Sequence, residues 1–152
     1  MSLPLNTAYY IPVTANYTYV KITTNYFLYT IDLSSKMISD PIFKSHILTT
    51  NNITVYGING SDFEVDVSGA GSVNLSGEVD RFRADLSGAG SINAKELKAK
   101  DVRVSVSGAA SADVYAKDYL DASVSGVGSI SYYGDPAKTK TDVSGVGSIS
   151  RK

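Results

Sequence analysis

The sequence predicts an all-β fold, a β-solenoid whose coils of about 19 residues stack in parallel. Three observations predict it: a glycine-rich motif returns at nearly constant spacing, apolar and polar residues alternate on both sides of the motif, and aligned positions of successive copies carry compatible side chains. The chain has 152 residues, which is enough for one domain with a buried core and too short for two comfortable ones.

The repeat is most visible in the segment VDVSGAGSVNL, residues 65–75. Related segments follow it: LSGAGSI at 86–92, VSGAASA at 106–112, and VSGVGSI at both 124–130 and 143–149. The first serines of the five motifs are separated by 19, 20, 18 and 19 residues; they are Ser68, Ser87, Ser107, Ser125 and Ser144. A loop that binds one phosphate is needed once, and the GxGxxG pattern fails because no third glycine follows. The period therefore indicates a repeat architecture.

Residues on both sides of the glycine motif alternate between apolar and polar. Phe63, Val65 and Val67 alternate with polar residues before the first motif, and Val73 and Leu75 do so after it. A period of two is the period of a β-strand. Each unit is thus predicted to contain a strand, an SGxGS corner, a second strand and a connection of about six residues. A weaker copy, NNITVYGINGSDF at 51–63, places the start of the array near residue 46 or earlier.

The glycines and serines of the motif are interpreted as corner residues. Glycine allows backbone dihedrals that are closed to other residues and lets successive corners lie close together. Serine side chains can form hydrogen bonds with nearby backbone at a bend. The first glycine is the same in all five copies, whereas Ala110 stands at the second glycine in one of them.

Two architectures can use such a unit, a solenoid with parallel coils or an antiparallel meander folded into a sandwich. In one outward column three of the four neighbouring pairs are opposite in charge and the fourth is a like pair; the column is Glu64, Arg83, Arg103, Asp121 and Lys140. This pairing favours parallel stacking. Two inward columns hold small and branched residues: Val67, Leu86, Val106, Val124 and Val143, and Val73, Ile92, Ala112, Ile130 and Ile149. A perimeter of about 63 Å per coil excludes a wide lumen.

The first 45 residues differ in composition from the rest. They contain no glycine but six of the eleven tyrosines, among Thr, Val and Ile residues that favour strands. Because a solenoid exposes the end of its core, residues 1–45 are predicted to form irregular N-terminal strands and a Tyr-rich cap, continuous with the solenoid repeats of residues 46–152. The segment SSKMISDP is expected to be a loop between these strands.

The repeats resemble those of a bacterial family, the putative auto-transporter adhesins, whose head domain is a domain of unknown function. The resemblance rests on the series VSGAGSV, LSGAGSI and VSGVGSI, on the period, and on the YYGDP segment from Tyr132 to Pro136; it covers residues 46–152. It implies a right-handed parallel β-helix in an exported or surface-attached protein of the bacterial cell envelope, periplasmic or extracellular, with an adhesive role. The family supplies no catalytic residues.

Composition argues against several functional classes. Fourteen basic and fifteen acidic residues give a net charge of −1, so no global field attracts nucleic acid or an anionic membrane. The absence of cysteine excludes disulfides and thiolate metal sites. No apolar run approaches the roughly 20 residues of a transmembrane segment, and the start, MSLPLNTAYY, lacks the pattern of a signal peptide. For an exported protein, the signal peptide is then expected to have been removed.

No catalytic residue, metal or cofactor is expected. A serine nucleophile would need a general base, and the single histidine, His46, lies outside the clear repeats. A calcium ion between Asp66 and Asp85, which fall in one outward column, is a weaker alternative to solvated surface charge. Five charged residues could form the acid–base group of a polysaccharide-active β-helix enzyme: Glu64, Asp66, Arg83, Asp85 and Arg103. Alternating charge is, however, also what the surface of any stack of strands needs.

The candidate ligand-binding residues are three outward tyrosines: Tyr56, Tyr115 and Tyr133. They fall in a column that also holds Ser76 and Lys95, and two adjacent rings could form a flat platform for a sugar. Ordinary cross-strand aromatic stacking is the simpler interpretation. The sequence thus predicts a non-enzymatic, adhesin-like surface protein that binds a glycan or a cell-surface protein. A carbohydrate-binding module and, less favoured, a polysaccharide-active enzyme are the alternatives, and end-to-end or homo-oligomeric association through the C-terminal SISRK segment stays open.

Overall fold

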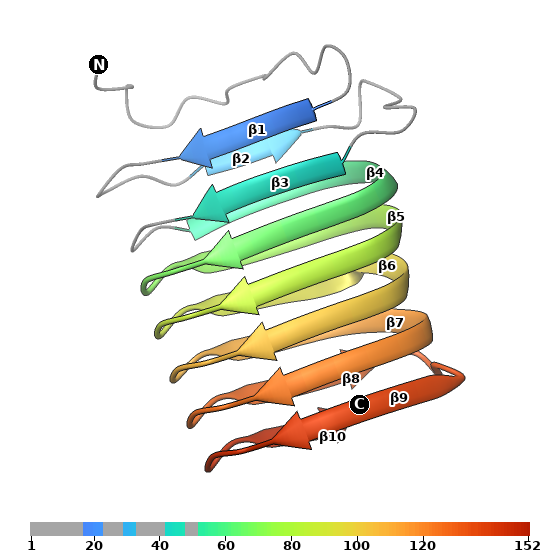
Figure 1. Cartoon of the computed structure of the whole chain (residues 1–152). Coiled ribbons are helices and arrows are strands. Elements are labelled where there is room, and N and C mark those ends of the chain that lie inside the picture. Colours follow the sequence, from blue (N-terminus) through green and yellow to red (C-terminus); the bar gives the residue numbers. More distant parts are fainter. Residues whose placement is uncertain (1–16, 23–28, 33–41, 48–51) are drawn as a thin grey trace.

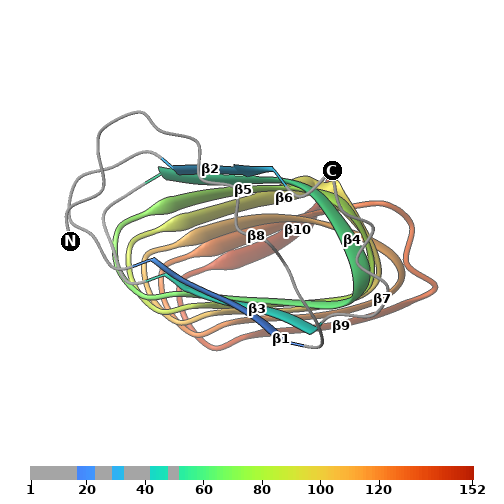
Figure 2. The same cartoon turned by 90° about the horizontal axis from the view of Figure 1, so that it is seen from above.

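The protein is a right-handed β-solenoid built of parallel strands. The computed structural model describes the backbone of residues 17–22, 29–32, 42–47 and 52–152, and the side chains from Thr54 onwards. Within these ranges the chain forms ten strands in one sheet, and every strand pairing is parallel. The coils turn clockwise as they recede from the N-terminal end (Figures 1 and 2). The predicted fold class is confirmed, and the described ranges contain no helix that could cross a membrane.

Each coil has two faces, which lie opposite each other when the solenoid is viewed along its axis (Figure 2). Three short strands belong to the first face: β2 (Tyr29–Asp32), β8 (Ser129–Tyr133) and β10 (Ser148–Arg151). Three belong to the second face: β1 (Tyr17–Ile22), β3 (Ile42–Ile47) and β9 (Lys138–Val143). Four long strands run over both faces: β4 (Asn52–Val67), β5 (Ser72–Leu86), β6 (Ser91–Val106) and β7 (Ser111–Val124).

Strands of the N-terminal region belong to the same sheet as the repeats. β1 pairs with β3, and β2 and β3 both pair with β4, so these strands extend the parallel ladder beyond the clear repeats. The predicted cap and the SSKMISDP loop lie outside the described residues. The division at residue 45 therefore stays a prediction.

The SGxGS motifs form a tight corner at one edge of the solenoid. Here the backbone ladder continues without a break, because the N–H groups of Ser87, Ala89 and Ser91 each donate to a carbonyl of the preceding coil at 2.9 Å. A Cβ atom added to Gly88 would overlap the carbonyl oxygen of Gly69 and would lie 2.8 Å from its nitrogen. The expected close approach of successive corners is thus confirmed. The expected left-handed dihedral occurs at Gly69, with φ of 141°, whereas Gly88 is held by the close approach alone.

The core fills the space between the two faces with columns of aligned apolar side chains. One inward column is Val65, Ala84, Val104 and Ala122, and all four side chains are buried. The rings of Phe63 and Phe82 stack in adjacent coils with their centroids 6.0 Å apart. Burying side chains of this size stabilises the fold by about 1.5–3 kcal/mol each, so these columns supply most of the favourable free energy. The alignment of the two columns of Val67 and Val73 predicted from the sequence is confirmed by the strand register. Their inward position holds up to the last coil, where Val143 is 43% exposed because no coil is described beyond it.

A wide bend lies opposite the corner and absorbs the differences in coil length. We define it by the residues between the two faces: 56–61, 76–80, 95–100, 115–118 and 133–137. The pairing between successive strands shifts register at this bend, once between β4 and β5, once between β5 and β6, and twice between β6 and β7. The two faces stay in register in all of these pairs. In the last coil the strand is interrupted between β8 and β9, where Gly134 has a φ of 94° and Pro136 has no N–H to donate.

Candidate functional site

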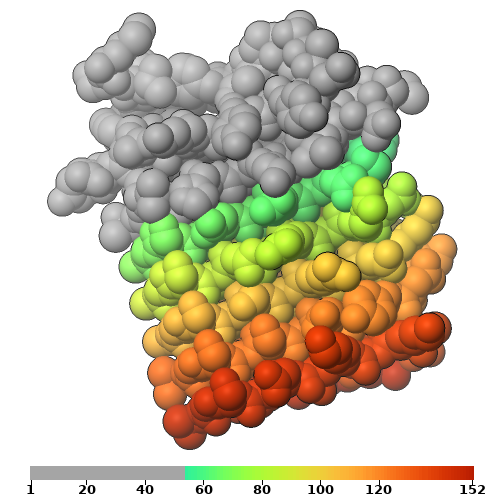
Figure 3. All heavy atoms as spheres, in the orientation of Figure 1, coloured from blue at the N-terminus to red at the C-terminus, as the bar shows by residue number. Residues whose placement is uncertain are grey.

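The outward side chains of the second face form three columns, of which the two farther from the corner are mostly charged. Each long strand exposes every second residue there, because the residues between them point into the core. Of these two, the column nearer the wide bend is Asp62, Arg81, Asp101, Tyr119 and Lys138, and the column nearer the corner is Glu64, Arg83, Arg103, Asp121 and Lys140. The second of these is the column predicted from the sequence, and its register is confirmed. Figure 3 views this face, on which the coils follow one another as parallel bands.

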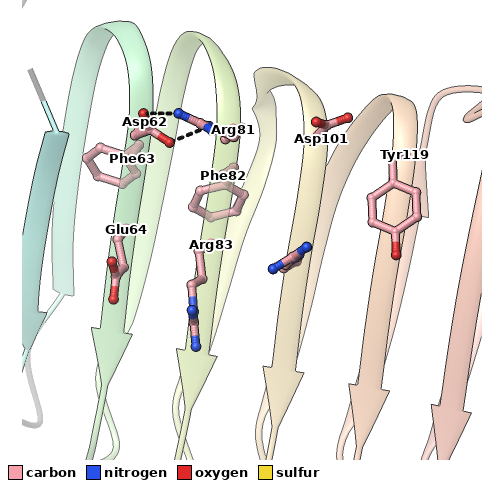
Figure 4. A pocket seen from close by; sticks show the side chains of 9 residues that line it. Asp62, Phe63, Glu64, Arg81, Phe82, Arg83, Asp101 and Tyr119 are labelled. Atoms are coloured by element: carbon pink, nitrogen blue, oxygen red, sulfur yellow. Dashed lines mark hydrogen bonds and ion pairs between the residues drawn. The ribbon is translucent and has the colours of Figure 1, made fainter. Parts of the chain in front are cut away.

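A hollow of about 440 Å³ lies between the two columns, over strands β4 to β7 (Figure 4). Its charged rim is contributed by Asp62, Glu64, Arg81, Arg83, Asp101 and Arg103; Tyr119 closes one end, and the buried Phe63 and Phe82 lie beneath it. Asp62, Arg81 and Asp101 lie at the end of the hollow next to the wide bend, and Arg83 lies toward the corner (Figure 4). A second hollow of about 160 Å³ adjoins it, and Arg83 and Arg103 line both.

Ion pairs between coils and within single strands engage several of the charges around the larger hollow. The Asp62 carboxylate contacts the Arg81 guanidinium twice, at 2.6 Å to Nε and at 2.7 Å to Nη2, and this contact raises the pKa of Arg81. Arg83 Nε lies 3.2 Å from Asp85 Oδ2 on its own strand. The Asp121 carboxylate contacts Lys140 Nζ at 3.5 Å and the Tyr119 hydroxyl at 3.5 Å.

Arg103 differs from these neighbours. It is exposed and lies in register between Arg83 on β5 and Asp121 on β7. Within the part of the chain whose side chains are described, its guanidinium has no ion pair and no side-chain hydrogen bond, since Asp85 contacts Arg83 and Asp121 contacts Lys140. Two guanidinium groups on facing positions of adjacent strands repel each other. Arg83 has a carboxylate in contact that offsets its charge, and Arg103 has none among the described side chains.

The carboxylates that were considered as an acid–base group lie on this same face. Asp66 and Asp85 are direct neighbours in the ladder, as predicted, and the column continues as Ser105 and Ser123. Asp85 is in contact with Arg83. From Thr54 onwards no three His, Asp or Glu side chains gather in the way that a metal ion requires.

The structure places the three predicted tyrosines in two separate locations. Tyr115 and Tyr133 are partners in the β7–β8 ladder, and both are half-buried. Tyr56 lies in the wide bend of β4, and 48% of it is exposed. The predicted column does not extend between them, because the register shifts pair Ser76 with Glu96 and Tyr115 with Lys98, which leaves Lys95 outside the column. The error comes from counting 19 residues through bends of unequal length.

Tyr56 lines a hollow of its own, of about 260 Å³, with amide and hydroxyl side chains; its other members are Thr54, Asn74, Leu75, Ser76, Asn93 and Glu96. Asn74 and Asn93 are ladder partners, and Asn93 Oδ1 is buried without a hydrogen-bond partner among the residues whose side chains are described. This asparagine pair was not predicted from the sequence. The signal was present, since the two asparagines occupy the same place two residues after the serine that ends the motif.

Comparison with known proteins assigns the chain to a family. The model of the putative auto-transporter adhesin head domain, known as the head GIN domain, matches residues 13–136. The chain belongs to this family. The match begins well before residue 46, where the resemblance read from the repeats began, and therefore includes β1, β2 and β3. None of the curated proteins compared with the chain matches it.

Three solved bacterial structures share the fold. A putative adhesin from Bacteroides fragilis superposes with a TM-score of 0.75 at 27% identity, over 82% of this chain and 56% of the other. A putative lipid binding protein from Parabacteroides distasonis gives 0.66 at 22% identity, over 90% and 56%. A putative adhesin from Parabacteroides distasonis gives 0.64 at 21% identity, over 92% and 62%. This chain thus spans a little over half the length of these proteins.

Proposed function

We propose that the protein is a non-enzymatic, adhesin-like solenoid that binds a polysaccharide along its second face. An adhesin-like surface role is supported by the family and by the likeness to the putative adhesin from Bacteroides fragilis. The observation that carries the polysaccharide proposal is the hollow over β4 to β7, where charged side chains and Tyr119 converge above the buried rings of Phe63 and Phe82. Ligand sites are concave surfaces on which a few polar groups converge.

The shape of the hollow favours an elongated ligand. It extends over four coils, whose strands lie about 4.8 Å apart, and is open toward the solvent (Figure 4). The ladder of backbone hydrogen bonds holds these strands in fixed register, so little conformational entropy would be lost on binding. Carboxylates can accept hydrogen bonds from sugar hydroxyls, and the face of Tyr119 can pack against a sugar ring.

Binding is favoured over hydrolysis by the contacts of the carboxylates. Glycoside hydrolysis needs two carboxyl groups placed on either side of the scissile bond and able to exchange a proton with it. Asp62 and Asp85 instead contact the guanidinium groups of Arg81 and Arg83. A location in the periplasm or outside the cell is part of the proposal and is supported by the same family membership.

The tyrosines stay a second proposed contact for a sugar. Tyr115 and Tyr133 are adjacent in the ladder, and Tyr56 lines a hollow with two asparagines that suits a neutral sugar. Association through the last coil also remains a proposal; its strand β9 is exposed along its whole length.

The proposal is tested by measuring binding and product release on one panel of neutral and acidic polysaccharides. We expect the purified chain to bind at least one polysaccharide saturably while the number of reducing ends stays constant. Release of new reducing ends would contradict a non-enzymatic role. If the chain binds no member of the panel but adheres to protein-coated surfaces, the polysaccharide proposal is wrong and the partner is a protein.

A further inference from the structure

We infer that the ligand of the second face is acidic, and that Arg83 and Arg103 together bind a carboxylate group of the sugar. This inference rests on the proposed polysaccharide binding and specifies its chemistry. It places the carboxylate at the corner end of the hollow over β4 to β7. The sugar ring then lies toward Tyr119, and its hydroxyl groups lie toward the bend end of the hollow.

The first argument comes from charge. Along the column nearer the corner, the neighbours of opposite sign are Glu64 with Arg83, Arg103 with Asp121, and Asp121 with Lys140. Arg83 and Arg103 are the like pair of this column, and like charges on facing positions destabilise a sheet. An anion between the two guanidinium groups removes this repulsion. Asp85 already offsets part of the charge of Arg83, and a bound carboxylate would add an attraction to both guanidinium groups.

The second argument comes from the contacts of the two arginines. Arg83 Nε contacts Asp85 Oδ2 at 3.2 Å, and 59% of the Arg83 side chain stays exposed. The Asp121 carboxylate, the nearest acidic neighbour of Arg103 in the ladder, contacts Lys140 and Tyr119 instead. Arg103 therefore keeps its full set of N–H donors available to a ligand among the side chains that the structure describes. Both arginines line both hollows on this face, so a ligand can reach them from either side.

The third argument comes from geometry. The planar guanidinium group carries parallel N–H donors that match the two oxygens of a carboxylate. Two such groups on adjacent strands, about 4.8 Å apart, can both reach one carboxylate. The opposite end of the hollow carries Asp101 and the Asp62–Arg81 ion pair, so it holds one more negative than positive charge, and its carboxylates can accept hydrogen bonds from hydroxyl groups. A molecule with an anionic end and a hydroxyl-rich end, such as a uronic acid in a polysaccharide, is complementary to this arrangement.

The experiment measures the affinity of the purified chain for polygalacturonate, with dextran as the neutral polymer, dextran sulfate as the sulfated polymer and duplex DNA as the phosphate polymer. We expect polygalacturonate to bind most tightly and its affinity to fall as salt is raised. Arg103→Gln should weaken this binding at least tenfold, and Arg83→Gln combined with Arg103→Gln should abolish it. Lys100→Gln is the matched control, because it removes one positive charge from the wide bend, outside the hollow.

Stability separates a ligand-binding arginine from a structural one. Because Arg103→Gln removes a like-charge contact, we expect its Tm to equal or exceed that of the unchanged chain, whereas a structural role would lower it. Polygalacturonate should raise the Tm of the unchanged chain and of Lys100→Gln, but not that of Arg103→Gln.

The possible failures can be told apart. Equal affinity of Arg103→Gln and Lys100→Gln for polygalacturonate would overturn the arginine site, while binding itself would leave the polysaccharide proposal in place. Tight binding of dextran alone would contradict the inference that the ligand is acidic. Stronger binding of dextran sulfate or DNA than of polygalacturonate would contradict the inference that its acidic group is a carboxylate. Absence of binding to all four polymers would overturn both this inference and the proposed function.

Discussion

At both edges of the solenoid the chain turns from one face to the other, but the corner and the wide bend are held by different contacts. At the SGxGS corner the backbones of successive coils approach so closely that Gly88 has no room for a Cβ atom above Gly69. At the wide bend, buried side chains such as Val79, Leu97 and Ala116 separate the chain from the opposite edge. The corner therefore repeats in sequence and length, whereas the bend varies from four to six residues between faces that stay in register. Close backbone contact keeps the number of residues in the corner constant, whereas packing by side chains allows the number of residues in the bend to vary.

The largest effect is expected at the corner. Gly88→Val should lower the free energy of unfolding by about 3 kcal/mol or more, because its side chain would overlap backbone atoms of Gly69 that cannot move without breaking the ladder. Ala109→Val is the matched control; Ala109 is exposed, and valine already occupies this place at Val127 and Val146. The control should change stability by no more than about 0.5 kcal/mol. Equal losses in a denaturant titration would show that corner contact does not fix the edge.

A smaller loss is expected between the two edges, in the core. Ala84→Phe should destabilise the protein by about 1 to 3 kcal/mol, because Ala84 is buried between Val65 and Val104 in adjacent coils. Ala89→Phe places the same ring on the exposed middle position of the corner and serves as the control. An unchanged Tm for Ala84→Phe would mean that the inward register is wrong by one residue.

The third prediction concerns the aromatic pair where the first face of the last coils meets the bend. Replacing both Tyr115 and Tyr133 by alanine should lower stability by about 1 kcal/mol, because the two are cross-strand partners. Binding to polygalacturonate should persist, since neither ring lines the charged hollow. A loss of polysaccharide binding without a loss of stability would place the ligand on the tyrosine platform instead.

The smallest effect is expected from the exposed ion pair on the wide bend. Lys100 Nζ lies 2.6 Å from Asp80 Oδ1; its hydrogen bond and its charge lower the pKa of Asp80, and Asp80 raises the pKa of Lys100. A carboxyl group whose pKa is lowered on folding stabilises the protein above its unfolded pKa, and this contribution is lost as pH falls through the folded pKa. The small stability difference between the unchanged chain and Lys100→Gln should therefore be present at neutral pH and disappear on acidification below about pH 4, and it should shrink at high salt. A difference that persists at pH 2 would assign it to lost packing of the lysine stem.

The contrast between the edges also explains what the sequence could and could not predict. The fold, the inward columns and the column from Glu64 to Lys140 follow from period and alternation, because those positions keep a fixed distance from the corner. The column of Tyr56, Ser76 and Lys95 crosses the bend, and there residue counting fails, since register shifts are decided by how side chains fill the bend. Whether Arg103 has an ion pair depends on which carboxylate each neighbouring cation contacts, and Asp85 contacts Arg83 while Asp121 contacts Lys140. Residue spacing does not predict these contacts.

The central claim, that the corner fixes the coil and the bend adjusts its length, is tested most directly by moving one inserted residue. A glycine inserted after Lys117 lengthens the shortest bend from four residues to five, a length that other coils already have. A glycine inserted after Ala89 lengthens the corner, where the N–H groups of Ala89 and Ser91 donate to the coil before. Denaturant titration of the two variants should show a loss of about 1 kcal/mol for the bend and at least about 3 kcal/mol for the corner. Equal losses, or a larger loss for the bend, would contradict the account.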